Sequence, residues 1–432
     1  MKRSIFSALC LTAVSFTSVI STVARAAETS IDASGWSEFH GPAANGFVPS
    51  GAIPDQWSDR DYRWRSELGG RDVGSPVVAG QQIFLLASNS EKQEISVRAL
   101  SVKSGRQLWL KSFPQTPHKL HKRNTFASST PAADATHVFV SWADSDHTLL
   151  KCFDHQGNLV WSRDFGRWQS QHGFGTSPRI FGSLVLLMNS QQASQLRPGQ
   201  EPGVSRIVAV DRTSGQTVWE TGLTTTRSCY GVPAIYTPAG GGPTQIINAN
   251  TGDGMFGLDA ETGKMLWNQN VFRMRCCSTP LIVGDIAIAS SGSGGGGNHL
   301  VAVRIPDDGG TPEEVYRLEK NAPYVPTPAI KDGLMFLVSD AGIASCVDAK
   351  SGESHWVKRI GGNFGASPVI VGDKLLLVSL SGIATVLAAS PEFQKLGESD
   401  LGGPVGATPA YVDGRLLIRV DDEIRCLGGE SL

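Results

Sequence analysis

Residues 209–219 read A-V-D-R-T-S-G-Q-T-V-W, and this unit returns along the chain with small changes. Asp211 is expected to accept bonds from backbone N–H groups of a tight turn, and Gly215 to supply its positive φ. Trp219 ends the second strand and is large enough to pack between neighbouring sheets. A unit that returns every roughly 40–50 residues indicates a repeat architecture. The other copies are residues 99–109, 152–161 (one residue shorter), 257–267 and 346–356.

A proline, usually preceded by Ser or Thr, marks the start of a β run in each repeat. Proline is tolerated where a strand begins because no ladder N–H is required of it there. Residues 375–378 and 383–386 show the two middle strands of one repeat most plainly. Four short antiparallel strands per repeat favour an eight-bladed, all-β propeller over a solenoid. The eight prolines are Pro76, Pro131, Pro178, Pro233, Pro280, Pro328, Pro368 and Pro409.

The end of the chain predicts how the ring closes. After Pro409 there are β runs to residue 427, but no Trp strand follows them. Trp64 precedes Pro76 by twelve residues, the same spacing by which Trp356 precedes Pro368. The N-terminal strand at residues 62–64 should therefore complete the last blade, which also removes an exposed sheet edge.

The first 26 residues have the pattern of a cleaved secretory signal. Lys2 and Arg3 precede an apolar run over residues 5–23, and Ala24-Arg25-Ala26 offers a cleavage site. A membrane anchor is the alternative, but Ser and Thr interrupt a run that is short for a span. The sequence therefore predicts export, to the periplasm or otherwise out of the cytoplasm, and no transmembrane segment after cleavage.

The rest of the chain divides into two parts. Residues 27–61 are expected to form an extended segment pinned to a surface by Trp36, Phe39 and Trp57, and residues 62–432 a single propeller. Net charge is −2 and charged residues make up 18%, so nothing favours nucleic acid as a partner. We expect a monomer.

The repeat unit resembles that of the pyrroloquinoline-quinone (PQQ) repeat family. That family contains quinoprotein dehydrogenases and a non-enzymatic scaffold lipoprotein of the machinery that assembles outer-membrane β-barrels. Residues 36–42 (W-S-E-F-H-G-P) and 122–128 (K-R-N-T-F-A-S) look like a bacterial branch of exported PQQ-like propellers. The resemblance covers about residues 36–427 and implies the fold. Since the repeated Trp and Gly are packing residues, it specifies no cofactor.

The loops that lead into blades lie on one face of a propeller, around the mouth of its channel. Here they include a basic loop, residues 118–123 (H-K-L-H-K-R), and five arginines in a nearly neutral chain. This favours a pocket for an anionic ligand, such as a quinone carboxylate, over a merely solvated rim. The candidate ligand-binding residues are Arg71, Asp72, Arg123, Asn124, His172, Arg227, Tyr230, Arg273, Arg275, Tyr324 and Asn363.

Six cysteines follow the signal segment, and they fall into two groups. Cys152, Cys346 and Cys426 occupy a strand position that other repeats fill with small apolar residues, so they are expected in the core. The second group lies in loops before blades 4 and 5, and we expect a disulfide within it, either across the blades or between adjacent residues. Its members are Cys229, Cys276 and Cys277. Quinoprotein dehydrogenases have an adjacent cysteine pair over the quinone, in a different sequence setting.

Two classes of function remain. The first is an exported, non-catalytic propeller that binds a protein partner or a small anionic ligand in the cell envelope. The second is a PQQ-dependent alcohol or sugar dehydrogenase with calcium. The sequence has no C-x-x-C-H haem motif, and no catalytic triad, zinc spacing or calcium set stands out. We therefore predict no catalytic and no metal-binding residues, which favours the first class.

Overall fold

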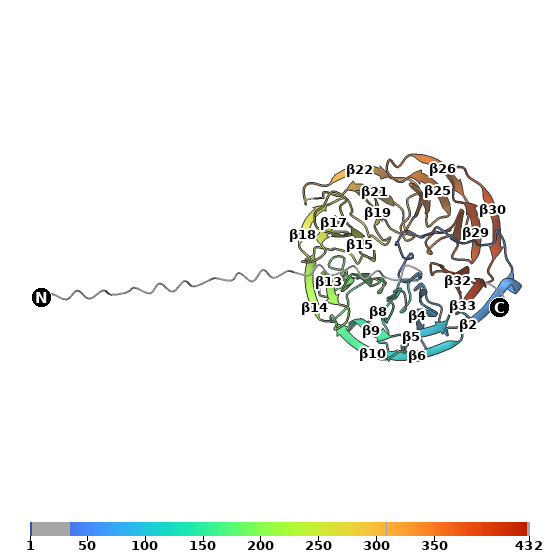
Figure 1. The fold of residues 1–432 in the computed structure, drawn as a ribbon, viewed down its shortest axis with the longest axis horizontal. Helices are drawn as coiled ribbons and strands as arrows, with labels where there is room; N and C mark the ends of the chain where they lie inside the picture. Colours follow the sequence, from blue (N-terminus) through green and yellow to red (C-terminus); the bar gives the residue numbers. More distant parts are fainter. Residues whose placement is uncertain (2–34, 308, 430–432) are drawn as a thin grey trace. The chain divides into compact units, whose positions relative to one another are not determined.

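Eight antiparallel sheets form a closed ring, each sheet being one blade of a β-propeller (Figure 1). The structure is a computed structural model and describes residues 1, 35–307 and 309–429. The predicted all-β fold of eight four-stranded blades is confirmed. Apart from Met1, the predicted signal sequence lies outside the described residues.

Each blade runs from a short inner strand at the channel to a long outer strand, except that the last blade takes its outer strand from the N-terminal side. Blades 1 and 2 are β3 (Val77–Ala79), β4 (Gln82–Asn89), β5 (Glu94–Ser101), β6 (Gln107–Pro114), and β7 (Ala132–Ala133), β8 (His137–Ala143), β9 (Thr148–Asp154), β10 (Leu159–Asp164). Blades 3 and 4 are β11 (Arg179–Phe181), β12 (Leu184–Asn189), β13 (Ser205–Asp211), β14 (Thr217–Leu223), and β15 (Ala234–Tyr236), β16 (Gln245–Asn250), β17 (Gly254–Asp259), β18 (Met265–Gln269).

The second half of the ring follows the same order. Blades 5 and 6 are β19 (Leu281–Val283), β20 (Ile286–Ser291), β21 (His299–Arg304), β22 (Glu313–Leu318), and β23 (Ala329–Lys331), β24 (Leu334–Val338), β25 (Ile343–Asp348), β26 (Ser354–Arg359). Blades 7 and 8 are β27 (Val369–Val371), β28 (Lys374–Val378), β29 (Ile383–Ala388), β30 (Lys395–Asp400), and β31 (Ala410–Val412), β32 (Arg415–Val420), β33 (Glu423–Gly428), β2 (Tyr62–Glu67). A two-residue strand, β1 (Phe47–Val48), and a 3-10 helix, η1 (Asp59–Asp61), precede the blades.

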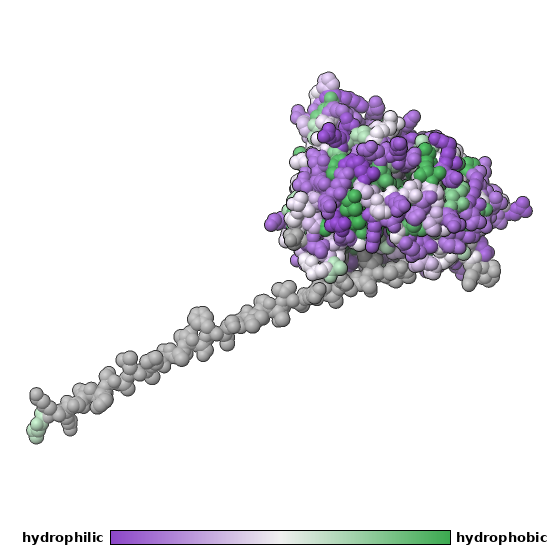
Figure 2. Space-filling view, turned by 90° about the horizontal axis from the view of Figure 1, so that it is seen from above, coloured by the Kyte–Doolittle hydropathy of each residue, from purple (hydrophilic) through white to green (hydrophobic). Residues whose placement is uncertain are grey.

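Hydrophobic residues fill the space between blades. The middle strands are buried on both faces, as in β12, where every residue is buried. The outer strands alternate between exposed residues and a buried Trp, as in β14. Figure 2 shows the outer face as mainly hydrophilic, with hydrophobic residues in separate patches. No helix in residues 35–307 and 309–429 is long and apolar enough to cross a membrane.

The repeated Trp and the repeated Gly meet where neighbouring blades join. The Trp161 indole N–H donates to Arg212 O at 2.9 Å, and its ring lies against Gly215 of blade 3. A Cβ at Gly215 would lie 2.6 Å from Trp161 Cδ2, so the turn needs glycine for space as well as for its φ of +70°. The predicted burial of the repeat Trp side chains is confirmed for Trp161, Trp219, Trp267 and Trp356, while Trp109 is half-buried.

The ring closes as predicted, by pairing of β2 with β33 (Figure 1). Trp64 lies opposite Cys426 in this pair, the same register that Trp161 has with Cys152 and that Trp356 has with Cys346. All three cysteines are fully buried, in agreement with the core position expected for them.

The Ser and Thr residues before the prolines form a ring of hydrogen bonds around the channel, which we call the hydroxyl ring. In seven blades, the backbone N–H of the residue before Pro donates to the hydroxyl of the equivalent residue in the next blade. The donor and acceptor pairs are Ser75–Thr130, Thr130–Ser177, Val232–Thr279, Thr279–Thr327, Thr327–Ser367, Ser367–Thr408 and Thr408–Ser75, with N···O distances of 2.9–3.2 Å. Valine at position 232 leaves the Ser177 N–H without such a hydroxyl.

Residues 36–48 lie inside the ring, bonded to the free inner edges of the innermost strands. This differs from the expected position on a surface, and the reason is that the inner strand of each blade leaves backbone N–H groups unpaired. Each backbone donor lies two residues after a blade-opening Pro, one layer deeper than the hydroxyl ring. The bonds are Val78 N to Trp36 O, Ala133 N to Ser37 O, Ile180 N to Glu38 Oε2, Ile330 N to Asn45 O and Ile370 N to Gly46 O. We call residues 36–48 the floor segment.

Candidate functional site

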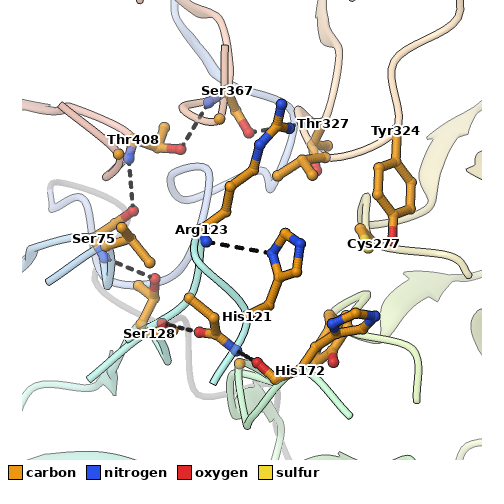
Figure 3. Close-up of a pocket in the computed structure, with 18 of the residues that line it drawn as sticks. Ser75, His121, Arg123, Ser128, His172, Cys277, Tyr324, Thr327, Ser367 and Thr408 are labelled. Carbon is orange, nitrogen blue, oxygen red and sulfur yellow. Dashed lines mark hydrogen bonds between the residues drawn. The ribbon is translucent and has the colours of Figure 1, made fainter. Parts of the chain in front are cut away.

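A cavity of about 520 Å³ lies at the centre of the ring, between the floor segment and the loops that enter the blades (Figure 3). Phe39 is the residue of the floor segment that lines it. The hydroxyl ring surrounds its lower wall, and Val73, Val325 and Leu380 add apolar surface. The cavity is therefore closed on one side by Phe39 and opens toward the face that the blade-entering loops form.

The charged groups of the cavity wall are all cationic. Lys122, Arg123 and Arg275 line it, and no Asp or Glu does. The Arg275 side chain is nearly buried and donates from Nη2 to Gln171 Oε1 at 3.2 Å and Gln192 Oε1 at 3.0 Å. Its Nε is buried and has no partner among the described residues. A cation held by neutral amides keeps its full charge, so the cavity attracts anions.

Two histidines lie side by side on this wall, and both favour the neutral form. The rings of His121 and His172 meet edge to face with centroids 4.8 Å apart. Burial lowers the pKa of His172 to about 4, and the nearby Arg275 contributes to the shift. Burial, followed by the charge of Arg123, also lowers the pKa of His121. At neutral pH these rings are therefore hydrogen-bonding groups rather than charges.

Two tyrosines and a thiol complete the wall. The Tyr230 hydroxyl donates to Gly173 O at 3.2 Å, and burial raises its pKa. The Tyr324 hydroxyl interacts with the Cys277 thiol, whose pKa burial raises to about 12. Because the thiolate is the nucleophilic form of cysteine, Cys277 is not an activated nucleophile here.

Six of the candidate residues from the sequence line the cavity together. They are Arg123, Asn124, His172, Tyr230, Arg275 and Tyr324. The other candidates lie outside its lining. Arg71 pairs with Asp421 at the rim, and Asp72 forms a buried ion pair with Arg419 of blade 8 at 3.0 Å. Arg227, Arg273 and Asn363 do not reach the cavity.

Sequence reasoning missed His121, Lys122, Phe39 and the hydroxyl ring. The first two stand beside Arg123 in the basic loop, and the Ser or Thr before each Pro was itself part of the repeat pattern. The basic loop and the repeat pattern are therefore enough to predict that these residues belong to the site. Nothing in the repeat pattern places Phe39, because the floor segment contains no copy of the repeat.

The loop cysteines are close together and unbridged in this structure. The Cys276 N–H donates to Cys229 Sγ at 3.3 Å, and the Tyr230 N–H donates to Cys276 O at 2.9 Å. These bonds bring two fully buried thiols of blades 4 and 5 side by side, while Cys277 turns to the cavity. A disulfide within this group stays a prediction, and the contacts favour Cys229 with Cys276.

The repeat, the blade order and the closure define the chain as an eight-bladed β-propeller, and its repeat unit is similar to that of the PQQ-repeat family. Residues 203–311 match the sequence model of a family described as outer membrane protein assembly factor BamB. A comparison with curated proteins found no match.

Solved structures of two kinds share the fold at low sequence identity. BamB from Moraxella catarrhalis is 14% identical, with a TM-score of 0.59 over 85% of this chain and 97% of that one. A europium-containing methanol dehydrogenase is 13% identical, with a TM-score of 0.63 over 90% of each chain. The quinohemoprotein alcohol dehydrogenase from Comamonas testosteroni is 15% identical, with a TM-score of 0.61 over 95% of this chain and 82% of that one. Identities this low establish the fold alone.

The cavity suits the carboxylates of a quinone such as PQQ but not an accompanying calcium ion. Calcium is bound by carboxylate and carbonyl oxygens, and no carboxylate lines the cavity. Residues 35–307 and 309–429 also contain no group of three or more His, Cys, Asp or Glu side chains that could hold a metal. The residues present therefore fit an anion and do not fit a calcium–quinone pair.

Proposed function

We propose that the chain is a non-catalytic binding propeller of the cell envelope that holds a small anionic ligand in its central cavity. The observation that carries the proposal is the wall itself, which presents Lys122, Arg123 and Arg275 and no lining carboxylate; Arg123 is paired with Asp340, which lies outside the lining. Phe39 closes the cavity on one side, and the tyrosine and hydroxyl groups offer further hydrogen bonds. Concave cavities that combine apolar surface with a few convergent polar groups are typical ligand sites.

The titratable groups of the wall support binding rather than catalysis. A general base needs a pKa near the operating pH, whereas the pKa of His172 is about 4. A cysteine nucleophile needs a lowered pKa, whereas that of Cys277 is about 12. The strongest groups left are permanent cations and neutral donors, which hold an anion without transforming it.

Calorimetric titration with citrate, a small carboxylate anion, tests this proposal. We expect binding to the unmodified chain and at least tenfold weaker binding to Arg275→Gln, because hydrogen bonds to charged groups contribute about 1.5–3 kcal/mol. Arg71→Gln is the matched control, since Arg71 lies at the rim and outside the cavity lining. Equal loss in both variants, or no binding of citrate, succinate and phosphate alike, would contradict an anion site.

A PQQ-dependent dehydrogenase is the second candidate. The adjacent Cys276 and Cys277, the latter on the cavity wall, favour it, and the missing carboxylates oppose it. Titration with PQQ, with and without calcium, separates the two. Calcium-dependent PQQ binding together with dye reduction by alcohols would replace our proposal, whereas calcium-independent binding without dye reduction would support it.

A further inference from the structure

The basic loop, residues 118–123, crosses the mouth of the central cavity. It belongs to the connection between β6 and β7, which runs from residue 115 to 131, whereas the connections into blades 7 and 8 run only from 360 to 368 and from 401 to 409. His121, Lys122 and Arg123 all line the cavity. The loop leads into blade 2, and Figure 3 shows Arg123 reaching toward Thr327 and Ser367 on the far side.

On its near side, the basic loop is fixed by several contacts with the loop that enters blade 3. The His121 N–H donates to His172 O at 3.2 Å, and Asn124 Nδ2 donates to the same oxygen at 2.7 Å. Leu120 packs against Gly173, where a Cβ would lie 2.3 Å from Leu120 Cδ2. These contacts fix the backbone on both sides of Arg123, so it is the Arg123 side chain that can move.

On its far side, the basic loop is held by a single ion pair. Arg123 Nη1 lies 2.9 Å from Asp340 Oδ1, in the turn between β24 and β25 of blade 6. Blades 2 and 6 are four positions apart in a ring of eight, so they face each other across the channel. Within residues 35–307 and 309–429, the loop makes no other hydrogen bond or ion pair with blades 5–8.

Asp340 is a fixed acceptor, and Arg123 is the movable partner. Asp340 Oδ2 accepts the backbone N–H of Tyr324 at 2.7 Å and that of Val325 at 3.3 Å. Its side chain is 14% exposed, whereas that of Arg123 is 32% exposed. A partly exposed ion pair between such groups contributes little, so it breaks readily when another anion offers itself.

We propose that the Arg123 side chain is a gate over the central cavity, that its ion pair with Asp340 holds it closed, and that an anionic ligand opens it by taking Arg123 from Asp340. Only the opening by an anionic ligand rests on the proposed function. Arg123 keeps an anionic partner throughout the exchange, and Asp340 keeps the two backbone N–H groups whose bonds it accepts. The strength of the ion pair then determines how fast molecules enter the cavity. It also determines how much ligand affinity is lost in displacing Asp340.

The gate can be tested without any ligand through Cys277, which lies in the cavity while the other described cysteines are fully buried. The measurement is the rate of N-ethylmaleimide addition to folded protein, with the labelled peptide identified by mass spectrometry. We expect at least threefold faster labelling of Cys277 in Arg123→Gln, which keeps the Asp340 charge near the thiol. Asp340→Asn, whose amide oxygen still accepts the two backbone N–H groups, should also label faster, but loss of its charge lowers the pKa of Cys277 as well, so Arg123→Gln decides the question of access. Asp421→Asn breaks the rim pair with Arg71 and should leave the rate unchanged.

Citrate titration of the same variants tests the exchange step. Asp340→Asn frees Arg123 and should raise citrate affinity at least threefold, whereas Arg123→Gln removes the cation and should lower it at least fivefold. Equal labelling rates in all proteins would overturn the gate. Faster labelling with the same citrate affinity in Asp340→Asn would overturn the exchange. Faster labelling with no citrate binding in any protein would support the gate and contradict the proposed function instead.

Discussion

Replacing Val232 by threonine should complete the hydroxyl ring and stabilise the propeller. The Ser177 N–H has no acceptor in the described part of the chain, because the equivalent side chain in blade 4 is that of Val232. Ser177 and Val232 are only 4% and 6% exposed, on the lower wall of the cavity, so few water molecules can reach the Ser177 N–H. Leaving a buried donor unsatisfied costs about 1–3 kcal/mol, which the new hydroxyl would recover. Burying that hydroxyl has its own desolvation cost, which reduces the gain. We expect the free energy of unfolding to rise by about 1 kcal/mol.

Urea unfolding, followed by tryptophan fluorescence, measures this effect as a higher midpoint at an unchanged slope. The matched control is the reverse substitution one blade further, Thr279→Val, which removes the acceptor of the Val232 N–H. That variant should lose about 1–3 kcal/mol. If Val232→Thr lowers the midpoint, or if Thr279→Val leaves it unchanged, the hydroxyl ring does not contribute to stability in the way argued.

Three further predictions follow from the packing of the blades, the floor segment and the loop cysteines. Trp219→Ala should lower the free energy of unfolding by about 3–5 kcal/mol through the cavity that it leaves, and a loss below 1 kcal/mol in urea would contradict the packing. Burial lowers the pKa of His40, a residue of the floor segment, from 6.5 to about 4, so the folded protein favours the neutral imidazole. The free energy of unfolding should therefore be unaffected by this group above pH 6.5 and should fall by up to about 3 kcal/mol as the pH drops toward 4. His40→Asn should flatten that part of the stability curve, and an unchanged curve would assign the pH dependence to other groups. Peptide mapping of non-reduced protein should find a disulfide between Cys229 and Cys276, and a bond from either to Cys277 would contradict the pairing.

The repeat pattern predicts the fold well, because each blade is decided by local signals. Pro368 begins a strand, Gly215 makes a turn and Trp161 fills a junction, and each acts within one repeat or its neighbour. Closure by β2 follows from the same logic, since Trp64 stands at the spacing of a repeat. The spacing of the repeats is therefore enough to predict which strand closes the ring.

The site is less predictable, because its key contacts join residues from distant repeats. Arg123 meets Asp340 across the ring, and no spacing in the sequence relates the two. For Asp72, the predicted position in the site is wrong. It stands beside Arg71 in a loop of the rim and was expected to face the channel, but Arg419 binds it in the wall between the last blade and the first. A position in a loop of the rim thus predicts that a residue lies near the channel mouth, but it does not predict the direction of the side chain.

The floor segment has a consequence for how the chain folds. Its bonds reach blades 1, 2, 3, 6 and 7, so the segment is bonded along its full length only once nearly the whole ring has formed. Linear repeat proteins gain stability one neighbour at a time and can lose it from the ends inward. Here residues that precede all eight blades in the chain become completely fixed only after most of the blades have formed. Unfolding should accordingly be a single concerted event rather than a sequential loss of blades.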